Sequence, residues 1–392
     1  MYLILNLSVL FLYVLNFVVL IFKNLLTFFC KFDKVIVVST DIFMCERIQK
    51  MKKVRFAVVG VGGLGPRHIW GIQEHSNMAE LVCVCDIDEQ VARECAKKYG
   101  DVKYYTDYYK MLEDGGFDCV VLVTPDQIHR EHAVAACDKG YHVLCEKPLA
   151  QTVEDCNAMI EAAKRNNVKF MTGQVARKSP GFAKAKELVD NGTIGELFFV
   201  ESEYAHDYQF LTPAWRKDPV NLRYSIIGGG CHAIDLLRWI AGDPEKVMAL
   251  ANRKVLTDWP VDDCTIAVMQ FPNGVVGKIF CGIGVKRNYT MRTCLYGTKG
   301  TIICDNRTPY ITLYRHAVTD NGQHIYPDQQ IPVEVKDHNI PEEIREMCEA
   351  ILNDTEPVCS AIEGSKTVAV GIACVESAAK GGEPVAPRYY KD

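Results

Sequence analysis

Apolar and polar residues follow three different patterns along this chain of 392 residues. Residues 1–50 contain one long apolar run. Residues 51–172 alternate between short, fully apolar runs and segments with helical spacing, which is typical of buried parallel strands connected by helices. In residues 173–392 the expected strands are longer, and apolar positions alternate with polar ones. The pattern predicts an α/β domain with a parallel sheet, followed by an α+β domain with an open, mostly antiparallel sheet.

Short apolar runs place the strands of the first domain, and helical spacing places its helices. The strands are expected at 54–59, 80–85, 118–124, 141–145 and 168–172. The helices are expected at 89–99, 107–113, 126–139 and 152–166. Thr152 followed by Asp155 is a capping signal for the last of these helices.

The second domain is expected to be built around hairpins. Its strands are predicted at 197–204, 246–255, 265–271 and 275–281, and its helices at 181–190, 341–352 and 364–380. Asn273-Gly274 predicts a hairpin with a type I′ turn. The stretch 297–300 predicts a further turn between two strands.

The N-terminal apolar run allows three interpretations. Residues 2–22 carry no charge and are long enough to cross a bilayer, and Lys23, Lys31 and Lys34 would then keep the following domain in the cytoplasm. The run resembles an export signal less well, because no small-residue cleavage site follows it. We favour a start at Met51, since folds of this type open with their first strand. Contact with a membrane is expected only if the run is a real anchor.

Composition narrows the choice of partner and compartment. The formal net charge of −5 does not favour nucleic acid as a partner. The 17 cysteines are scattered through expected strands and helices, which favours buried thiols in a reducing compartment over a disulfide framework. We therefore expect a cytoplasmic location, or a domain anchored on the cytoplasmic side of a membrane. His129 and His132 have the spacing of metal ligands, but no further cluster supports them, and no metal is expected.

A glycine-rich turn follows the first expected strand. It has the pattern G-x-G-x-x-G and reads Gly60-Val61-Gly62-Gly63-Leu64-Gly65. These glycines permit a tight turn, close approach of the backbone to a pyrophosphate, and tight packing of the next helix, whose first N–H groups face the phosphates. Asp86 ends the next strand, where a carboxylate accepts hydrogen bonds from a ribose and repels a 2′-phosphate. We expect these residues to bind NAD in preference to NADP; the alternative is an ordinary glycine turn beside a surface aspartate.

Two further strand ends are expected at the same edge of the parallel sheet, where ligands of such sheets bind. One is Thr124-Pro125, with His129 a turn later. The other is Glu146-Lys147-Pro148. We expect both to line the cofactor site, with Pro125 and His129 shaping its nicotinamide side.

Lys147 is the candidate for proton transfer. It is followed by Pro148, so it is held on rigid backbone, and the bond between them is a candidate cis bond. An ammonium beside an oxidised nicotinamide and shielded from water has its charged form disfavoured. Lys147 could then exchange a proton with an alcohol whose carbon gives up a hydride.

From Lys53 to the C-terminus the chain resembles the glucose–fructose oxidoreductase, inositol dehydrogenase and rhizopine-catabolism (Gfo/Idh/MocA) oxidoreductases. The shared motifs are GVGGLG (60–65), TPDQIH (124–129), EKP (146–148), GQVAR (173–177), AWR (214–216) and GGGCHAIDLLRW (228–239). The resemblance implies a Rossmann domain followed by an open sheet that carries the substrate site and often the oligomer interface. It implies NAD(P) redox chemistry on sugars, cyclitols or related polyols, in a homodimer or homotetramer. Lys147 would match the family's catalytic lysine and His232 its catalytic histidine.

The chain departs from the family at one position. Family members often carry an aspartate four residues before the histidine, and this chain has Gly228 there. Asp235, three residues after His232, either orients the imidazole or supports its own helix. Histidine alone can still act as an acid or base near neutral pH.

Four further residues are candidates for lining a polyol pocket beside His232 and Asp235. They are Arg177, Tyr208, Trp215 and Arg216. An aromatic ring suits a sugar face, and guanidinium donors suit hydroxyls or a carboxylate. Each is equally consistent with packing or surface use.

The favoured interpretation is an NAD-dependent oxidoreductase that transfers hydride between nicotinamide and a sugar-like small molecule. Two alternatives stay open. One is a lyase or glycosidase that oxidises a sugar transiently with tightly held NAD and then returns the hydride. The other is a non-enzymatic regulator that senses NAD, which Lys147 and His232 argue against.

Overall fold

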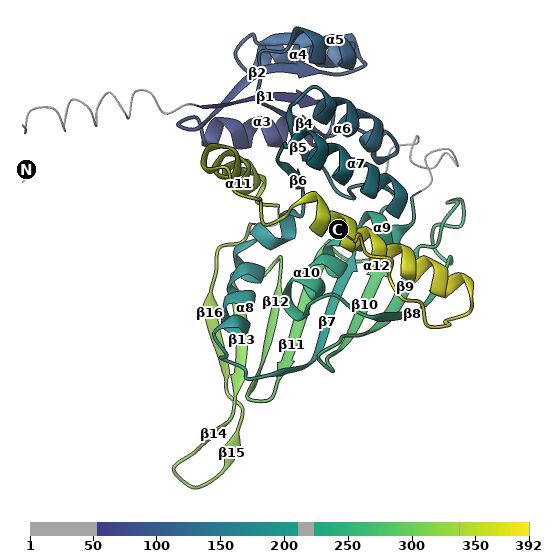
Figure 1. Ribbon diagram of the computed structural model, residues 1–392. Helices are drawn as coiled ribbons and strands as arrows, with labels where there is room; N and C mark the ends of the chain where they lie inside the picture. Colours follow the sequence, from purple (N-terminus) through teal and green to yellow (C-terminus); the bar gives the residue numbers. More distant parts are fainter. Residues whose placement is uncertain (1–52, 211–222, 337, 392) are drawn as a thin grey trace, which may run out of the picture. The chain divides into compact units, whose positions relative to one another are not determined.

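The computed structural model describes residues 53–210, 223–336 and 338–391, and Figure 1 shows their elements. The apolar run 2–22, Trp215 and Arg216 lie outside these ranges, so what the sequence predicts for them stays a prediction. Within the ranges, no helix combines the length and apolar character needed to cross a membrane.

The first sheet has six parallel strands, and its order reverses between β1 and β4. In spatial order the strands are β3 (Lys103–Tyr105), β2 (Ala79–Cys85), β1 (Val54–Val59), β4 (Cys119–Leu122), β5 (His142–Cys145) and β6 (Phe170–Thr172). The last residues of β2, β1, β4 and β5 are in register, because Val59 pairs with Cys85 and Leu122, and Leu122 pairs with Cys145. The segments that follow these strands therefore begin at one edge of the sheet, beside the reversal where such sheets bind ligands.

Helices connect these strands and cover the sheet. They are α3 (Gly65–Glu74), α4 (Glu89–Lys98), α5 (Tyr108–Asp114), the 3₁₀ helix η1 (Asp126–Ile128), α6 (His129–Asp138) and α7 (Val153–Asn166). Thr152 accepts a hydrogen bond from the N–H of Asp155 at 3.1 Å, so the capping prediction is confirmed. Asp88 and Asp107 cap α4 and α5 in the same way.

The second sheet has eight strands and is antiparallel except where β7 and β10 run parallel. In spatial order the strands are β16 (Asp328–Pro332), β13 (Tyr310–Arg315), β12 (Gly300–Asp305), β11 (Thr290–Gly297), β7 (Leu197–Ala205), β10 (Val276–Gly282), β9 (Cys264–Gln270) and β8 (Lys246–Asn252). A two-stranded hairpin is formed by β14 (Ala317–Val318) and β15 (His324–Ile325). The predicted turn at 297–300 joins β11 to β12.

Helices cover one face of this sheet. The remaining helical elements are η2 (Val175–Lys178), α8 (Pro180–Asp190), α9 (Ser225–Gly228), α10 (Cys231–Ala241), α11 (Ile340–Asn353) and α12 (Ala361–Ala379). Side chains of α8, α10 and α12 share one hydrophobic core with the inward residues of the strands. The other face leaves Met248, Leu250, Ile266 and Val268 between 38% and 59% exposed.

The chain returns to the first sheet near its end. Ile344 and Met347 of α11 belong to the same buried cluster as Phe56 and Val58 of β1. Helix α11 lies against α3 at Gly71, where an added Cβ would sit 3.0 Å from the Ile344 side chain (Figure 1). A segment that the sequence groups with the second domain thus completes the core of the first.

The hairpin between β9 and β10 forms as predicted, but its turn type differs. A type I′ turn requires a positive φ at both central residues. Gly274 has φ +81°, but Asn273 is not among the described residues with a positive φ. The N–H of Gly274 donates to the carbonyl of Phe271 at 3.1 Å, which places Pro272 at the first central position. Because proline fixes φ at a negative value, the turn is type I followed by a left-handed glycine.

Candidate active site

The glycine turn lies between the ends of β1 and β4 and the start of α3. Gly60 has φ +86°, and a Cβ there would sit 2.7 Å from the carbonyl oxygen of Val123. A Cβ on Gly65 would sit 2.4 Å from the carbonyl oxygen of Gly60, so the start of α3 can approach the turn only without a side chain. Asp86 accepts a hydrogen bond from the N–H of Val61 at 2.9 Å and thereby holds the turn against the end of β2.

The turn fits a dinucleotide. A Cβ on Gly63 would meet nothing within 4 Å, and one on Gly62 would meet only the Val91 side chain at 4.0 Å, so the backbone here is open to a ligand. No side chain caps the N-terminus of α3 after Leu64. Pro66 has no N–H and the N–H of Arg67 donates to the carbonyl of Leu64 at 2.8 Å, so Gly65 supplies the N–H that this end of the helix offers to a phosphate.

The end of β4 is joined to the end of β5 through His129. Its imidazole Nε2 lies 2.9 Å from the carbonyl oxygen of Thr124, and its Nδ1 lies 3.1 Å from that of Pro148. The ring therefore spans the two strand ends that the sequence predicts to line the site, while Pro125 follows Thr124 on the same edge. The hydroxyl oxygen of Thr124 is buried and has no hydrogen-bond partner among the described residues, so it can receive one from a ligand.

Lys147 follows Glu146 at the end of β5, and the Lys147–Pro148 bond is cis, as the sequence analysis suggested. The Glu146 carboxylate accepts from His68 Nε2 at 2.9 Å and from the N–H of Lys147 at 3.1 Å. Burial raises the pKa of Glu146, but the hydrogen bond and charge of His68 and the charge of Lys147 outweigh it and lower that pKa to about 2. Glu146 thus joins the end of β5 to His68 of α3, and the cofactor contact that the sequence predicts for it stays a prediction.

A second buried carboxyl group completes this cluster with His68 and Glu146. Glu343 of α11 is fully buried, and neither of its oxygens has a hydrogen-bond partner among the described residues. One ligand atom each from His68, Glu146 and Glu343 lie within 4.8 Å of one another. Burial and the charge of Glu146 raise the pKa of Glu343 well above its ordinary value, so the group is neutral near pH 7.

His232 lies in the first turn of α10 and is buried. Tyr204 stacks on its ring with centroids 6.1 Å apart, and His338 meets it edge-on at 5.7 Å. Burial, followed by the charges of Lys147, His338 and Arg223, lowers the pKa of His232 well below its ordinary value. The imidazole is therefore neutral at pH 7, and the Lys147 ammonium is near enough to act on it.

The space over Gly228 is filled by an arginine. A Cβ on Gly228 would sit 2.3 Å from Nε of Arg223. One terminal nitrogen of Arg223, Nη1, donates to Oδ1 of Asp126 at 3.2 Å. A small hollow beside it includes Tyr208, whose hydroxyl is 2.7 Å from that of Tyr204. The position that the sequence analysis marked as lacking an aspartate thus lies against a guanidinium.

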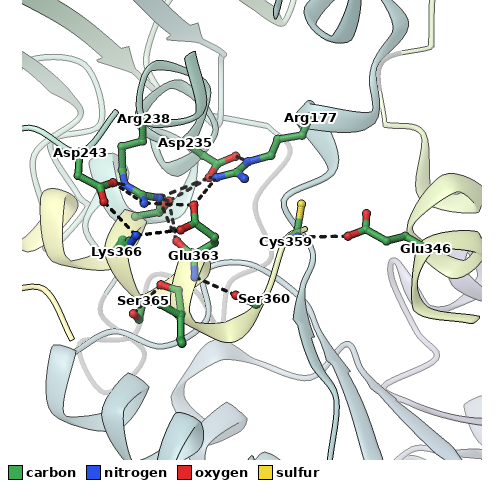
Figure 2. A network of polar contacts seen from close by, with 12 residues as sticks. Arg177, Asp235, Arg238, Asp243, Glu346, Cys359, Ser360, Glu363, Ser365 and Lys366 are labelled. Atoms are coloured by element: carbon green, nitrogen blue, oxygen red, sulfur yellow. Dashed lines mark hydrogen bonds and ion pairs between the residues drawn. The ribbon is translucent and has the colours of Figure 1, made fainter. Parts of the chain in front are cut away.

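Arg177 and Asp235 form a buried pair with each other. Arg177 donates to both carboxylate oxygens of Asp235, at 2.7 and 2.6 Å, and to Glu363 at 3.1 Å (Figure 2). Thr367 also donates to Asp235, and Arg238 joins the network through Glu363 at 3.3 Å. Asp235 has no hydrogen bond to His232 among the described contacts. These side chains join η2, α10 and α12, and the role at a polyol pocket that the sequence predicts for Arg177 and Asp235 stays a prediction.

Five residues of the candidate site were not predicted as site residues from the sequence: His68, Asp126, Tyr204, Arg223 and Glu343. Asp126 lies inside the TPDQIH motif, and His68 lies one turn after the glycine pattern, so local signals existed for both. Tyr204, Arg223 and Glu343 come from distant segments of the chain. Their neighbours are set by the packing of α9, β7 and α11, which no local pattern reports.

Comparison with known proteins agrees with this geometry. The oxidoreductase family profile with an NAD-binding Rossmann fold matches residues 54–174, and the GFO/IDH/MocA C-terminal domain profile matches residues 182–303. The inositol 2-dehydrogenase 2 of Saccharopolyspora erythraea is 30% identical over 253 residues, covering 64% of this chain and 72% of that protein. The myo-inositol 2-dehydrogenase of Thermotoga maritima is 28% identical over 336 residues, covering 83% and 96%.

Solved structures support the fold. A levoglucosan dehydrogenase in complex with NADH and L-sorbose superposes with a TM-score of 0.79 at 23% identity, covering 87% of this chain and all of that one. The fold class, the cofactor class and the family resemblance inferred from the sequence are thereby confirmed. The chain belongs to the Gfo/Idh/MocA family of oxidoreductases, with NAD as the cofactor of its Rossmann domain.

Proposed function

We propose that this chain is an NAD-dependent dehydrogenase that oxidises or forms a CH–OH group of a sugar, cyclitol or related polyol, with Lys147 and His232 as its catalytic residues. The observation that carries the proposal is that Lys147 lies near enough to His232 for its charge to lower the pKa of the imidazole. Lys147 stands at the edge of the parallel sheet that holds the glycine turn, and its charge acts on the buried imidazole of His232. The names of the relatives, which act on inositol and levoglucosan, suggest the substrate class.

The residues of the first domain would hold the cofactor. The turn from Gly60 to Gly65 and the N-terminus of α3 suit the pyrophosphate, and Asp86 suits the adenosine ribose. When bound, NAD supplies the hydride acceptor. Thr124 and the backbone held by His129 shape the space beyond, where a substrate carbon must stand.

Lys147 and His232 would have different tasks at the substrate. Lys147 Nζ has no ion-pair partner among the described residues, so it is available to the substrate hydroxyl. As an ammonium it would donate a hydrogen bond to the hydroxyl oxygen, and after losing its own proton the neutral amine would take the hydroxyl proton as the carbon gives up its hydride. A neutral His232 can accept a hydrogen bond from a second hydroxyl and hold the substrate in place. Tyr204 and Tyr208 offer hydroxyls beside the imidazole. Trp215 and Arg216 stay sequence predictions for the same pocket.

The proposal is tested by Lys147→Ala. We expect turnover to fall by about two orders of magnitude or more, because proton transfer by a positioned group contributes roughly that much. Binding of NADH, followed by its fluorescence, should stay within about twofold of wild type, since the pyrophosphate and ribose contacts are untouched. The exposed Lys139→Ala is the matched control, with both properties kept. Unchanged turnover in Lys147→Ala would remove this lysine from the mechanism.

We also propose a cytoplasmic location and self-association into a homodimer or homotetramer. The cysteines described in the structure are free thiols, and nearly all are buried, which suits a reducing compartment. Met248 and Leu250 of β8 stand beside Val268 and Ile266 of β9 on the uncovered face of the second sheet. An apolar face of this kind favours contact with a second copy.

A further inference from the structure

Arg223 brings a positive charge to the catalytic histidine. Its Nε lies over Gly228, four residues before His232, and it contributes to the lowered pKa of that imidazole. The side chain is 14% exposed, so it is largely withdrawn from solvent. A guanidinium in such a place needs a partner, because burying an isolated charge is costly.

Asp126 satisfies only part of this demand. It accepts from one terminal nitrogen of Arg223 at 3.2 Å, and its second oxygen accepts from Gln151 at 3.0 Å. An arginine has five N–H donors in a planar fork, so one contact leaves donors on Nε and on the other terminal nitrogen. Nε lies over Gly228, and Arg223 lines a small hollow together with Tyr208 and Trp259.

The other carboxylates near His232 are engaged elsewhere. Glu146 is held by His68, and Asp235 is held by Arg177 in a bidentate pair. Lys147 has no ion-pair partner among the residues that the structure describes. Two cations, Lys147 and Arg223, therefore act on His232 among the described residues. Asp126 is the carboxylate that contacts Arg223, and Glu146 lies beside Lys147.

We infer that the substrate carries a carboxylate as well as hydroxyls, and that Arg223 is the specificity-determining residue that receives it. The inference rests on the proposed function and narrows its substrate class to polyhydroxy acids, such as uronates and aldonates. The planar fork of arginine matches a carboxylate in a bidentate arrangement, and a charge-assisted pair of this kind gives discrimination as well as affinity. Lys147 would then be left to the hydroxyl that reacts.

The test compares each neutral sugar with its acid. Wild-type protein is assayed with NAD against glucose, gluconate, glucuronate and glucose 6-phosphate, and against inositol as a neutral cyclitol. We expect kcat/KM to be at least tenfold higher for one of the two acids than for glucose and inositol. A higher kcat/KM for glucose 6-phosphate than for both acids would overturn the assignment of a carboxylate in favour of a phosphate. Equal kcat/KM values for the neutral substrates and the acids would overturn the inference while leaving the proposed function intact.

Variants locate the effect at Arg223. In Arg223→Gln the preference for the acid should fall by about 10- to 100-fold through KM, as expected for loss of a charge-assisted pair, with NADH affinity unchanged. Arg223→Lys should recover part of it. Arg93→Gln removes the same charge from an exposed position on α4 and should change nothing. Unaltered preference in Arg223→Gln would contradict the assignment.

A binding measurement covers the case in which nothing turns over. Calorimetric titration of gluconate and glucuronate into the NADH complex should show saturable binding to wild type that Arg223→Gln loses. Asp126→Asn keeps Arg223 and removes its competing carboxylate, so its affinity for the acid should equal or exceed that of wild type. Absence of binding to both wild type and Asp126→Asn would overturn the inference, whatever the outcome for the proposed function.

Discussion

Glu343 shows how a single buried residue can store a proton beside the proposed catalytic turn. Its carboxyl group faces His68 of α3 and Glu146 and Lys147 of the β5 turn. Lys178 of η2 acts on it as well, but that lysine is paired with Glu346 of α11. Ionising two neighbouring buried carboxyl groups costs free energy, because the like charges repel each other and are shielded from solvent. Glu146 has two donors and keeps its charge, so Glu343 takes the proton.

This arrangement predicts a pH-dependent stability. The folded state keeps the Glu343 proton above the ordinary glutamate pKa of about 4.3, whereas the unfolded state releases it, so the free energy of unfolding falls as pH rises through that value. The slope can reach about 1.4 kcal/mol per pH unit. Glu343→Gln cannot titrate, so its melting temperature should gain on that of wild type between pH 4 and pH 8.

The control is Glu349→Gln, which removes a partly exposed carboxyl of the same helix and should follow wild type. A constant difference in melting temperature between Glu343→Gln and wild type would show that Glu343 is ionised in the folded protein. Stabilisation by a divalent cation, present in wild type and absent in Glu343→Gln, would instead identify the cluster with His68 as a metal site.

The residues that sequence alone could place are those whose role follows from local backbone. Gly60, Asp86 and Lys147 stand at strand ends, and a strand end is visible as the last residue of an apolar run. The side-chain chemistry of Arg177 suits a sugar, and the spacing of Asp235 from His232 suggests a place near the imidazole. Their mutual pairing depends on how η2 packs on α10, which spacing along the chain does not report.

At the scale of elements, the glycine turn is defined by what cannot fit there. The start of α3 touches the turn through Gly65, whereas Gly63 is open. Two features of the sheets could not be predicted from the sequence. β3 is short and has two exposed residues out of three, so it lacks the apolar run of a buried strand. The parallel pairing of β7 with β10 joins segments far apart in the chain.

This contrast predicts opposite effects of one added methyl group. Gly65→Ala should destabilise the protein without ligand by about 1–3 kcal/mol, because the Cβ would overlap the Gly60 carbonyl oxygen and force the backbone to shift. Gly63→Ala should leave that stability within about 0.5 kcal/mol of wild type. It should still weaken NADH binding if the pyrophosphate lies over the turn. Denaturant unfolding and NADH fluorescence measure the two effects, and equal stability losses would contradict the packing described for the turn.

At the scale of the whole molecule, the two sheets differ in how many of their faces the chain covers. Both faces of the first are covered within the chain, since α11 returns to pack on β1. The second has one covered face, and the other presents rows such as Leu250 beside Ile266. Domain order and sheet type could be predicted from periodicity. The return of α11 could not, because an amphipathic helix does not specify which sheet it covers.

The uncovered face predicts a change of assembly. Leu250→Asp places a charge among the apolar rows, so it should shift the protein toward monomers without a large loss of stability, because Leu250 is 59% exposed. Light scattering after size exclusion gives the mass, and Glu245→Lys, an exposed charge change just before β8, serves as the control. An unchanged oligomer in Leu250→Asp would place the contact elsewhere.

The most direct test of the central claim is the steady release of NADH by wild-type protein supplied with NAD and a panel of polyols and polyhydroxy acids. A dehydrogenase with Lys147 and His232 at its reacting centre should accumulate NADH over many turnovers on at least one substrate, and Lys147→Ala should not. NAD bound tightly while substrate is converted without net NADH would point to an internal redox cycle. Binding with no conversion at all would contradict the proposed enzyme.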